Sequence, residues 1–439
     1  MRIKHLALTL GLLGASLAAQ AGTVTVLTSF PKELTSAYKK AFEAQNPGIT
    51  LEILNKNTVA AIAYARELPA GQRPDVMWAS APDAFEVLAR NKLLTPAPDT
   101  VNPAAPAKIG NYPLNDPQGL YYGQALAGYG IMWNTRYLAA HKLPAPKEWR
   151  DLTRPEYFGH VAISSPSRSG TTQLTVETIL QGEGWEKGWN LLLEMMGNVA
   201  AVTDRSFGVP DGVNNGQFGI GIVIDFFGLA GKYSGFPVDF AYPTMTAVVP
   251  ANIGMLAGGK NPEEAKKFMR FSMSKEGQQI LFDPKISRLP ILPYSELKPP
   301  PNYPNPQEVA KRAKVQFDSV LSEQRYQVVT GMFDQMVTFR LKELQAATKA
   351  IQQAEAALKT KPNARGRELV QQARALAYSP LVSAENVKNE EFLELFRKSR
   401  RDVAVSKQIS GIEQLWADKA RQNYARAEQL ATEALAQAK

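Results

Sequence analysis

Short apolar runs alternate with longer amphipathic stretches between residues 22 and 90. The runs TVTVLTS, ITLEILN and DVMWAS are rich in β-branched residues, and about a dozen residues with helical spacing follow each one. This alternation predicts βαβ units built on a parallel sheet. Proline and glycine then dominate residues 95–119, which predicts an excursion over the surface.

A second alternating block follows the long apolar strand predicted at residues 124–133. It contains HVAIS, NVAAVT, IGIVID and VDFAYP, separated by helical runs. The pattern continues as AVVPANIGMLAG and a helix over residues 262–273. Two similar blocks, with later sequence able to return to the first, predict a two-lobed α/β protein. We expect a cleft between the lobes and crossover strands near residues 124–134 and 241–250.

The expected domains are two α/β lobes and a mainly helical C-terminal region. The predicted boundaries are 22–123 with 243–300 for lobe I, 124–242 for lobe II, and 301–439 for the helical region. The proline-rich stretch KPPPNYPNP marks the last transition, and apolar positions then recur at helical spacing, with further helical runs at 366–378 and 389–434. This region is interpreted as a helical cap on the lobes or a short bundle, or alternatively as a docking surface for another protein.

The N-terminus has the organisation of a secretory signal peptide. Arg2 and Lys4 precede an apolar core, and Ala19-Gln20-Ala21 is a small-x-small cleavage site. We therefore predict a signal peptide over residues 1–21 and a periplasmic protein. No other segment has the roughly 20 apolar residues of a membrane span.

The amino-acid composition argues against several kinds of functional site. The chain has no cysteine, which excludes disulfides, thiol nucleophiles and thiolate metal sites. Only His141 and His160 lie beyond the predicted signal peptide, which argues against a multi-histidine metal centre. The net charge is +9, but the basic residues are scattered along the predicted C-terminal helices rather than interleaved with aromatic residues, so nucleic acid is not expected as a partner.

Several predicted strands end in hydroxyl-rich junctions. Ser29 follows TVTVL, Ser80 follows DVMWA, and ISSPSRSGTTQ begins at residue 163. Ligands of open parallel sheets lie where strands lead into helix N-termini, which have unpaired amides and partial positive charge. A serine cap followed by a glycine can thus form an anion cradle, to which Arg168 adds a full charge. Ordinary N-capping is the alternative for each junction.

Two further charged residues are placed where a cleft would lie. Arg205 stands at a predicted strand end and could bind an anion or form a structural ion pair. Asp225 closes IGIVI and could accept hydrogen bonds from ligand hydroxyls or cap the next helix. The candidate ligand-binding residues are therefore Ser29, Ser80, Ser165, Arg168, Ser169, Gly170, Thr171, Arg205 and Asp225.

An ordered set of motifs resembles the periplasmic solute-binding proteins of bacterial ABC-type importers. The set comprises TVTVLTSFPKEL, DVMWAS, GYGIMWN, SSPSRSGTT, GQFGIGIVIDFF, VVPANIGMLAGGKNPEEAKKF and RLPILP. It is similar to the branch containing ferric-ion, sugar-phosphate and phosphoglycerate binders, most of all to phosphoglycerate-transport regulatory binding components. The resemblance covers about residues 22–300 and implies a type II clamp that closes by hinge motion around its ligand.

The resemblance also implies roles for particular residues. Iron-binding members have two adjacent tyrosines where this chain has Phe226 and Phe227, so ferric binding is disfavoured. In sugar-phosphate binders the matching strand end has an aspartate that holds substrate hydroxyls, as Asp225 could. The helix-start serines would then form the phosphate cradle.

The implied function is capture of a small phosphorylated organic anion, a phosphoglycerate or sugar phosphate, and its presentation to a membrane ABC permease. The alternative is a ligand sensor that regulates phosphoglycerate uptake through a membrane signalling partner. We expect a monomer without cofactor, metal or enzymatic activity. A secreted phosphate-ester hydrolase is a third interpretation, and it lacks the cysteine, histidine and clustered acidic residues that such chemistry uses.

Overall fold

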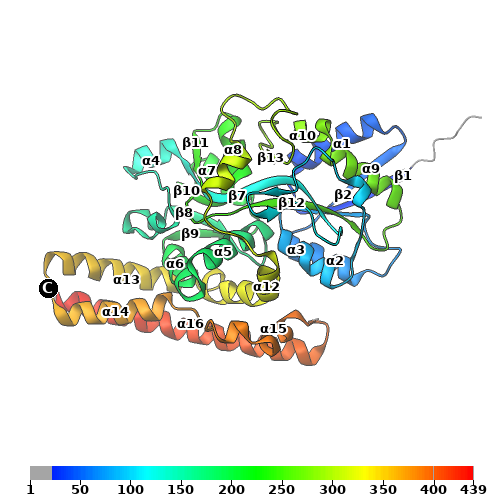
Figure 1. Ribbon diagram of the computed structural model, residues 1–439. Helices are drawn as coiled ribbons and strands as arrows, with labels where there is room; N and C mark the ends of the chain where they lie inside the picture. The colour runs from blue at the N-terminus through cyan, green and yellow to red at the C-terminus, as the bar shows by residue number, and fades with distance from the viewer. Residues whose placement is uncertain (1–21, 399, 439) are drawn as a thin grey trace, which may run out of the picture.

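A computed structural model describes residues 22–398 and 400–438 of the chain (Figure 1). The predicted signal peptide lies outside these residues. Two α/β lobes stand side by side, and a group of long helices lies along one side of them (Figure 1). One 11-stranded sheet runs through both lobes, with the main order β2-β1-β3-β12-β7-β10-β8-β9.

Lobe I begins with the predicted βαβ units. Its strands are parallel in the order β2-β1-β3, with Val26 of β1 opposite both Ile53 of β2 and Val76 of β3. The alternation of apolar runs and amphipathic helices is therefore confirmed. The elements are β1 (Gly22–Thr28), α1 (Lys32–Gln45), β2 (Ile49–Asn55), α2 (Thr58–Glu67), β3 (Val76–Ala79) and α3 (Pro82–Arg90).

The predicted surface excursion contains only short elements. These are β4 (Leu94–Thr95), η1 (Pro98–Thr100), β5 (Lys108–Ile109) and β6 (Tyr112–Pro113). The chain later returns to lobe I through β12 (Val248–Leu256), α9 (Pro262–Met273), α10 (Lys275–Ile280) and β13 (Leu289–Pro290).

Lobe II repeats the plan of strands followed by helices. Strand β8 pairs in parallel with both β9 and β10. The elements are α4 (Thr135–His141), η2 (Trp149–Thr153), η3 (Pro155–Tyr157), β8 (Val161–Ser164), α5 (Gly170–Glu183), α6 (Trp185–Gly197), β9 (Val199–Thr203), α7 (Gly208–Asn214), β10 (Ile220–Ile224), α8 (Asp225–Tyr233) and β11 (Val238–Ala241).

Strand β7 (Tyr122–Asn134) joins the two lobes. Its first half pairs with β12, and its second half pairs with β10 and β11. The second predicted crossing is interrupted, because β11 ends at Ala241 and β12 begins at Val248. Strands β11 and β12 both pair with β7, so the second crossing lies beside this buried strand. The lobe boundaries given above remain predictions.

The C-terminal region is helical, as expected. Its elements are α11 (Pro306–Arg312), α12 (Ser319–Phe333), the π-helical turn η4 (Asp334–Thr338), α13 (Leu341–Thr360), α14 (Ala364–Tyr378), η5 (Asn386–Lys388), α15 (Glu390–Arg397) and α16 (Val403–Gln437). Helices α13, α14 and α16 run alongside one another and extend past lobe II (Figure 1). The predicted run over 389–434 is two helices, α15 and α16.

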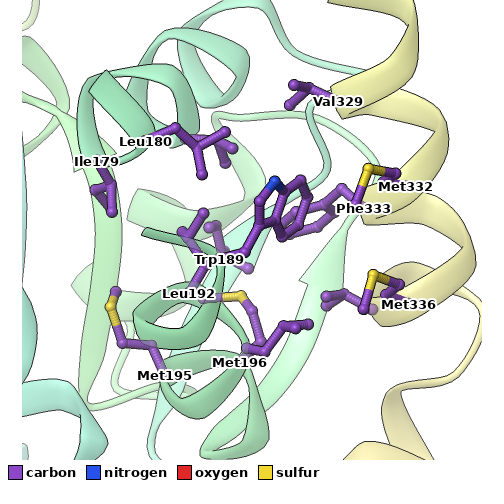
Figure 2. Packing of buried hydrophobic residues seen from close by; sticks show 14 of the residues in the cluster. Ile179, Leu180, Trp189, Leu192, Met195, Met196, Val329, Met332, Phe333 and Met336 are labelled. Atoms are coloured by element: carbon purple, nitrogen blue, oxygen red, sulfur yellow. The ribbon is translucent and has the colours of Figure 1, made fainter. Parts of the chain in front are cut away.

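These helices share a hydrophobic core with lobe II. Trp189 and Met196 of α6 face Met332, Phe333 and Met336 of α12 and the π-helical turn (Figure 2). All five side chains are almost fully buried. The helical region therefore packs as a cap on the lobes, the first of the two interpretations.

The longest helix, α16, has 35 residues and is polar along much of its length. Across the described part of the chain, no helix combines the length and the apolar character of a membrane crossing.

Candidate functional site

The hydroxyl-rich turn after β8 leads into the N-terminus of α5, at the junction between the lobes. Ser169 is the N-cap, and its Oγ accepts a hydrogen bond from the Thr172 amide at 3.2 Å. The Ser169 and Thr171 hydroxyl oxygens lie 2.9 Å apart. The cap that starts a 14-residue helix therefore also gathers hydroxyl groups at its positive end.

Lobe I meets this helix end directly. The Gly170 amide donates to Thr58 Oγ1 at 3.3 Å, and the Thr58 hydroxyl lies 3.4 Å from Ser29 Oγ. A Cβ at Gly170 would lie 2.6 Å from Thr58 Oγ1, so a side chain there would hold the lobes apart. Glycine at this position is what permits the close approach.

A cavity of about 20 Å³ lies between these groups. That volume is room for about one water molecule, so an organic ligand requires wider separation of the lobes. Its lining includes six of the nine candidate residues, namely Ser29, Arg168, Ser169, Gly170, Thr171 and Arg205. A hollow of about 670 Å³ adjoins it, sharing Pro31, Phe226 and Phe227.

The two candidate arginines differ in their partners. Arg168 donates to Asp204 at 2.7 Å, within lobe II, and Asp204 is almost fully exposed. Arg205 donates to Asn55 Oδ1 across the junction at 3.1 Å, and its guanidinium lies 5.0 Å from the centre of the Phe207 ring. Partial burial lowers the pKa of Arg205 from its usual high value. Both cations are therefore at the cavity, and Arg205 already links the lobes.

Asp225 is the first residue of α8, directly after the buried strand β10. Its Oδ2 accepts hydrogen bonds from the Gly128 amide at 2.8 Å and the Tyr242 hydroxyl at 2.9 Å. Its Oδ1 has no hydrogen-bond partner, although the side chain is fully buried. Burial raises the pKa of Asp225 to about 7, against the hydrogen bonds from Gly128 and Tyr242, which lower it. Asp225 lines neither this cavity nor the adjoining hollow, whereas Phe226, the next residue, lines both.

Arg288 is a residue of this site that the sequence analysis did not identify. It is 1 % exposed, and its Nη1 donates to Ser80 Oγ at 3.0 Å. The guanidinium carbon lies 4.0 Å from the ring centre of Phe30 in lobe I and 3.6 Å from that of Phe226 in lobe II. Its Nη2 has no hydrogen-bond partner.

Arg288 also lines the larger hollow. Burial lowers its pKa to about 9, and nearby Asp225 acts in the opposite direction. At neutral pH the guanidinium therefore remains positively charged. In the sequence, Arg288 is the single arginine of the apolar stretch ISRLPILP, which is the signal that could have pointed to a buried cation.

Two candidates occupy other positions. Ser80 follows β3 and binds Arg288, so its contact with the site is indirect. Ser165 lies 2.6 Å from the Ser167 hydroxyl and donates to Asp334 Oδ1 of the π-helical turn at 3.2 Å. Ser165 thus faces the C-terminal helices and is not in the cavity lining.

The sequence profile of the bacterial extracellular solute-binding proteins matches residues 72–315. The chain belongs to this family. It is 29% identical over 377 residues to the phosphoglycerate transport regulatory protein PgtC of Salmonella typhimurium, a match that covers 85% of this chain and 89% of the relative.

Solved structures show the same fold. The periplasmic binding protein AfuA of Actinobacillus pleuropneumoniae, determined with exogenous fructose-6-phosphate bound, has a TM-score of 0.63 and 19% identity, covering 72% of this chain and 99% of that one. A ferric binding protein from Campylobacter jejuni has a TM-score of 0.56 and 15% identity, covering 71% and 98%. The chain therefore has the type II periplasmic binding protein fold that the motifs implied.

Phe226 and Phe227 stand at the start of α8, and both line the cavity. Their ring centres are 4.6 Å apart. They place hydrocarbon, with no oxygen donor, at this part of the site. Within residues 22–398 and 400–438, no three His, Asp or Glu side chains come together as a possible metal site.

Proposed function

We propose that this protein is a periplasmic binding protein that captures a small phosphorylated organic anion, a phosphoglycerate or a sugar phosphate, and presents it to a membrane ABC permease. The observation that carries the proposal is the pair of adjoining hollows at the lobe junction, one lined by the α5 N-terminus and the other by Arg288, with Phe226, the neighbour of buried Asp225, lining both. Arg288 and Asp225 each keep one hydrogen-bonding atom without a protein partner.

The α5 end supplies the groups that a phosphate needs. Ser169 and Thr171 contribute hydroxyls, and the helix N-terminus contributes partial positive charge. Ser29 and Thr58 stand opposite on lobe I. A phosphate held here would contact both lobes, so that its binding favours the closed clamp.

Asp225 and Arg288 supply the groups for the organic part of the ligand. The free Oδ1 of Asp225 can accept a hydrogen bond from a ligand hydroxyl, and the free Nη2 of Arg288 can donate to a ligand oxygen. These roles require binding and orientation but no covalent step, which supports a binding protein rather than an enzyme. The site also supports a monomer, because residues from both lobes of a single chain build it.

One observation favours a second candidate function, a ligand sensor acting through a membrane signalling partner. Helix α12 contacts both lobes, since Ser322 donates to Asp83 Oδ2 of α3 at 2.6 Å and Arg325 pairs with Glu177 of α5 at 2.7 Å. A change in lobe separation would strain one of these contacts and shift the C-terminal helices. PgtC, the relative described above, is named as a regulatory protein of phosphoglycerate transport.

The test is a thermal-shift panel on the purified full chain without its signal peptide. The compounds are 3-phosphoglycerate, phosphoenolpyruvate, glycerol 3-phosphate, glucose 6-phosphate and ferric citrate. A phosphorylated ligand at a hundred times its Kd should stabilise the fold by about 2.7 kcal/mol. No shift with any phosphorylated compound would overturn the proposal, and a shift with ferric citrate alone would point to a metal-binding protein instead.

Uptake measurements in the native host distinguish delivery from sensing. A strain lacking this protein should lose uptake of the identified ligand if delivery is the task, even when the transporter is expressed from a foreign promoter. If sensing is the task, that strain should recover uptake, because only transcription of the transporter was lost.

A further inference from the structure

Two aromatic rings limit the directions from which a ligand can approach the guanidinium of Arg288. Phe30 and Phe226, one from each lobe, lie against its carbon at 4.0 and 3.6 Å from their ring centres. Rings at these distances occupy the faces of the group, so only the N–H groups at its edge can bind a polar ligand. Nη1 donates to Ser80, and Nη2 is buried without a protein acceptor, so Nη2 is an edge donor that a ligand oxygen could satisfy.

The unused donor carries an energetic cost in the described state. Arg288 is 1 % exposed, so Nη2 is removed from water without receiving a protein acceptor. A buried, unpaired donor on a charged group is strongly unfavourable, and an anionic ligand oxygen would remove the penalty. Asp225 does not serve as that acceptor, because its own Oδ1 is also unpaired.

The site thus has two separate places for negative charge. The first is the α5 N-terminus with Ser169, Gly170 and Thr171, and the second is the edge of Arg288, which lines the adjoining hollow. A sugar phosphate has one anionic group and would leave the second place unfilled. A phosphorylated carboxylic acid has two.

Asp225 adds a requirement for a hydroxyl near the second anion. Asp225 directly precedes Phe226, whose ring centre lies 3.6 Å from the guanidinium carbon of Arg288. An acceptor on Asp225 beside a donor on Arg288 matches a hydroxyl next to a carboxylate, the arrangement in an α-hydroxy acid.

We propose that Arg288 binds a carboxylate of the ligand. It would make the site selective for phosphorylated α-hydroxy acids over sugar phosphates and other phosphate esters that have no carboxylate. This inference rests on the proposed function and goes further, because it assigns a specificity-determining residue and one ligand class.

The test compares two ligands that differ only at the relevant group. 3-Phosphoglycerate and glycerol 3-phosphate share the phosphate and the adjacent hydroxyl, but glycerol 3-phosphate has a hydroxymethyl group in place of the carboxylate. Calorimetric titration of the full chain should give a Kd for 3-phosphoglycerate at least tenfold lower than for glycerol 3-phosphate. The R288M variant should weaken 3-phosphoglycerate at least tenfold and leave glycerol 3-phosphate within about twofold.

A charge-conserving variant and a control complete the experiment. R288K keeps the charge without the planar edge, and should recover only part of the preference for 3-phosphoglycerate. R168M removes a different cation of the cavity, one paired with Asp204, and should not change the ratio of the two affinities.

The possible failures are distinguishable. Equal affinity of the unmodified protein for both ligands overturns the carboxylate assignment and leaves the proposed function standing. Loss of both affinities by the same factor in folded R288M overturns it as well. Absence of binding by any phosphorylated compound overturns the proposed function itself. If R288M does not fold, the ratio of the affinities for the two ligands, measured in the unmodified protein and in R288K, tests the carboxylate assignment instead.

Discussion

Arg325 of α12 and Glu177 of α5 form a buried, two-pronged ion pair that fastens the C-terminal helices to lobe II. Arg325 Nε donates to Glu177 Oε1 at 2.9 Å, and Nη2 donates to Oε2 at 2.7 Å. The Glu177 side chain is fully buried and that of Arg325 is 7 % exposed. The Trp185 ring, 5.0 Å from the guanidinium carbon, further excludes water.

Replacing only Arg325 should be strongly destabilising. The R325M variant leaves the Glu177 carboxylate buried without its partner, which is expected to cost about 3–5 kcal/mol of unfolding free energy. Denaturant-induced unfolding measures this change. The double variant R325M/E177L removes both charges and should recover most of the loss. A double variant as unstable as the single one would contradict this assignment.

The inner and outer faces of the helical cap give a matched pair of phenylalanines. Phe333 is fully buried in the core of Figure 2, whereas Phe339 is 53% exposed. F333A should lower the unfolding free energy by about 3–5 kcal/mol, because it leaves a cavity. F339A should change it by less than about 1 kcal/mol. Equal effects would mean that the helices do not share the core of lobe II.

Asp83 should make stability depend on pH. Burial raises its pKa to about 7, while the hydrogen bond from Ser322 acts in the opposite direction and nearby Glu177 raises it further. In the unfolded chain the same carboxyl has a pKa of about 3.9. Between these values the folded chain holds a proton that the unfolded chain has released, so stability is lost as pH rises from about 4 to about 7.

Melting temperatures at pH 5, 6, 7 and 8 measure this effect. The unmodified protein should melt at progressively lower temperature, with Asp225 contributing in the same direction because its pKa is also about 7. D83N has a side chain of similar shape that does not titrate, and its decline should be shallower. An identical decline in D83N would exclude Asp83 as a source.

Gly170 should be required for closure around the ligand. A Cβ there would lie 2.6 Å from Thr58 Oγ1 and 3.0 Å from Ala81 Cβ, so G170V should reduce ligand affinity at least tenfold without unfolding either lobe. G411V is the control, because a Cβ at Gly411 on α16 meets nothing within 4 Å. Titration with 3-phosphoglycerate compares the two. Equal affinities would place the ligand elsewhere.

Much of the architecture could be predicted because it depends on local patterns. The alternation of apolar strands and amphipathic helices located the βαβ units, and the cap at Ser169 located the start of α5. The long apolar run at β7 likewise predicted a strand shared by both lobes.

The remaining features depend on contacts between distant segments. Arg288 reaches the site because β13 pairs with β7 at Leu126, more than 160 positions earlier in the chain, and the apolar sequence around Arg288 does not show which distant segments it meets. Ser165 points towards Asp334, which lies 169 residues away. Only the folded chain shows which side of the turn its hydroxyl faces.

A crystal structure of the full chain with 3-phosphoglycerate tests the central claim most directly. The account predicts one ligand between the lobes, with its phosphate at the α5 N-terminus, its carboxylate on Arg288 and its hydroxyl on Asp225. A ligand bound away from the lobe junction, with Arg288 and Asp225 unchanged in their contacts, would contradict it.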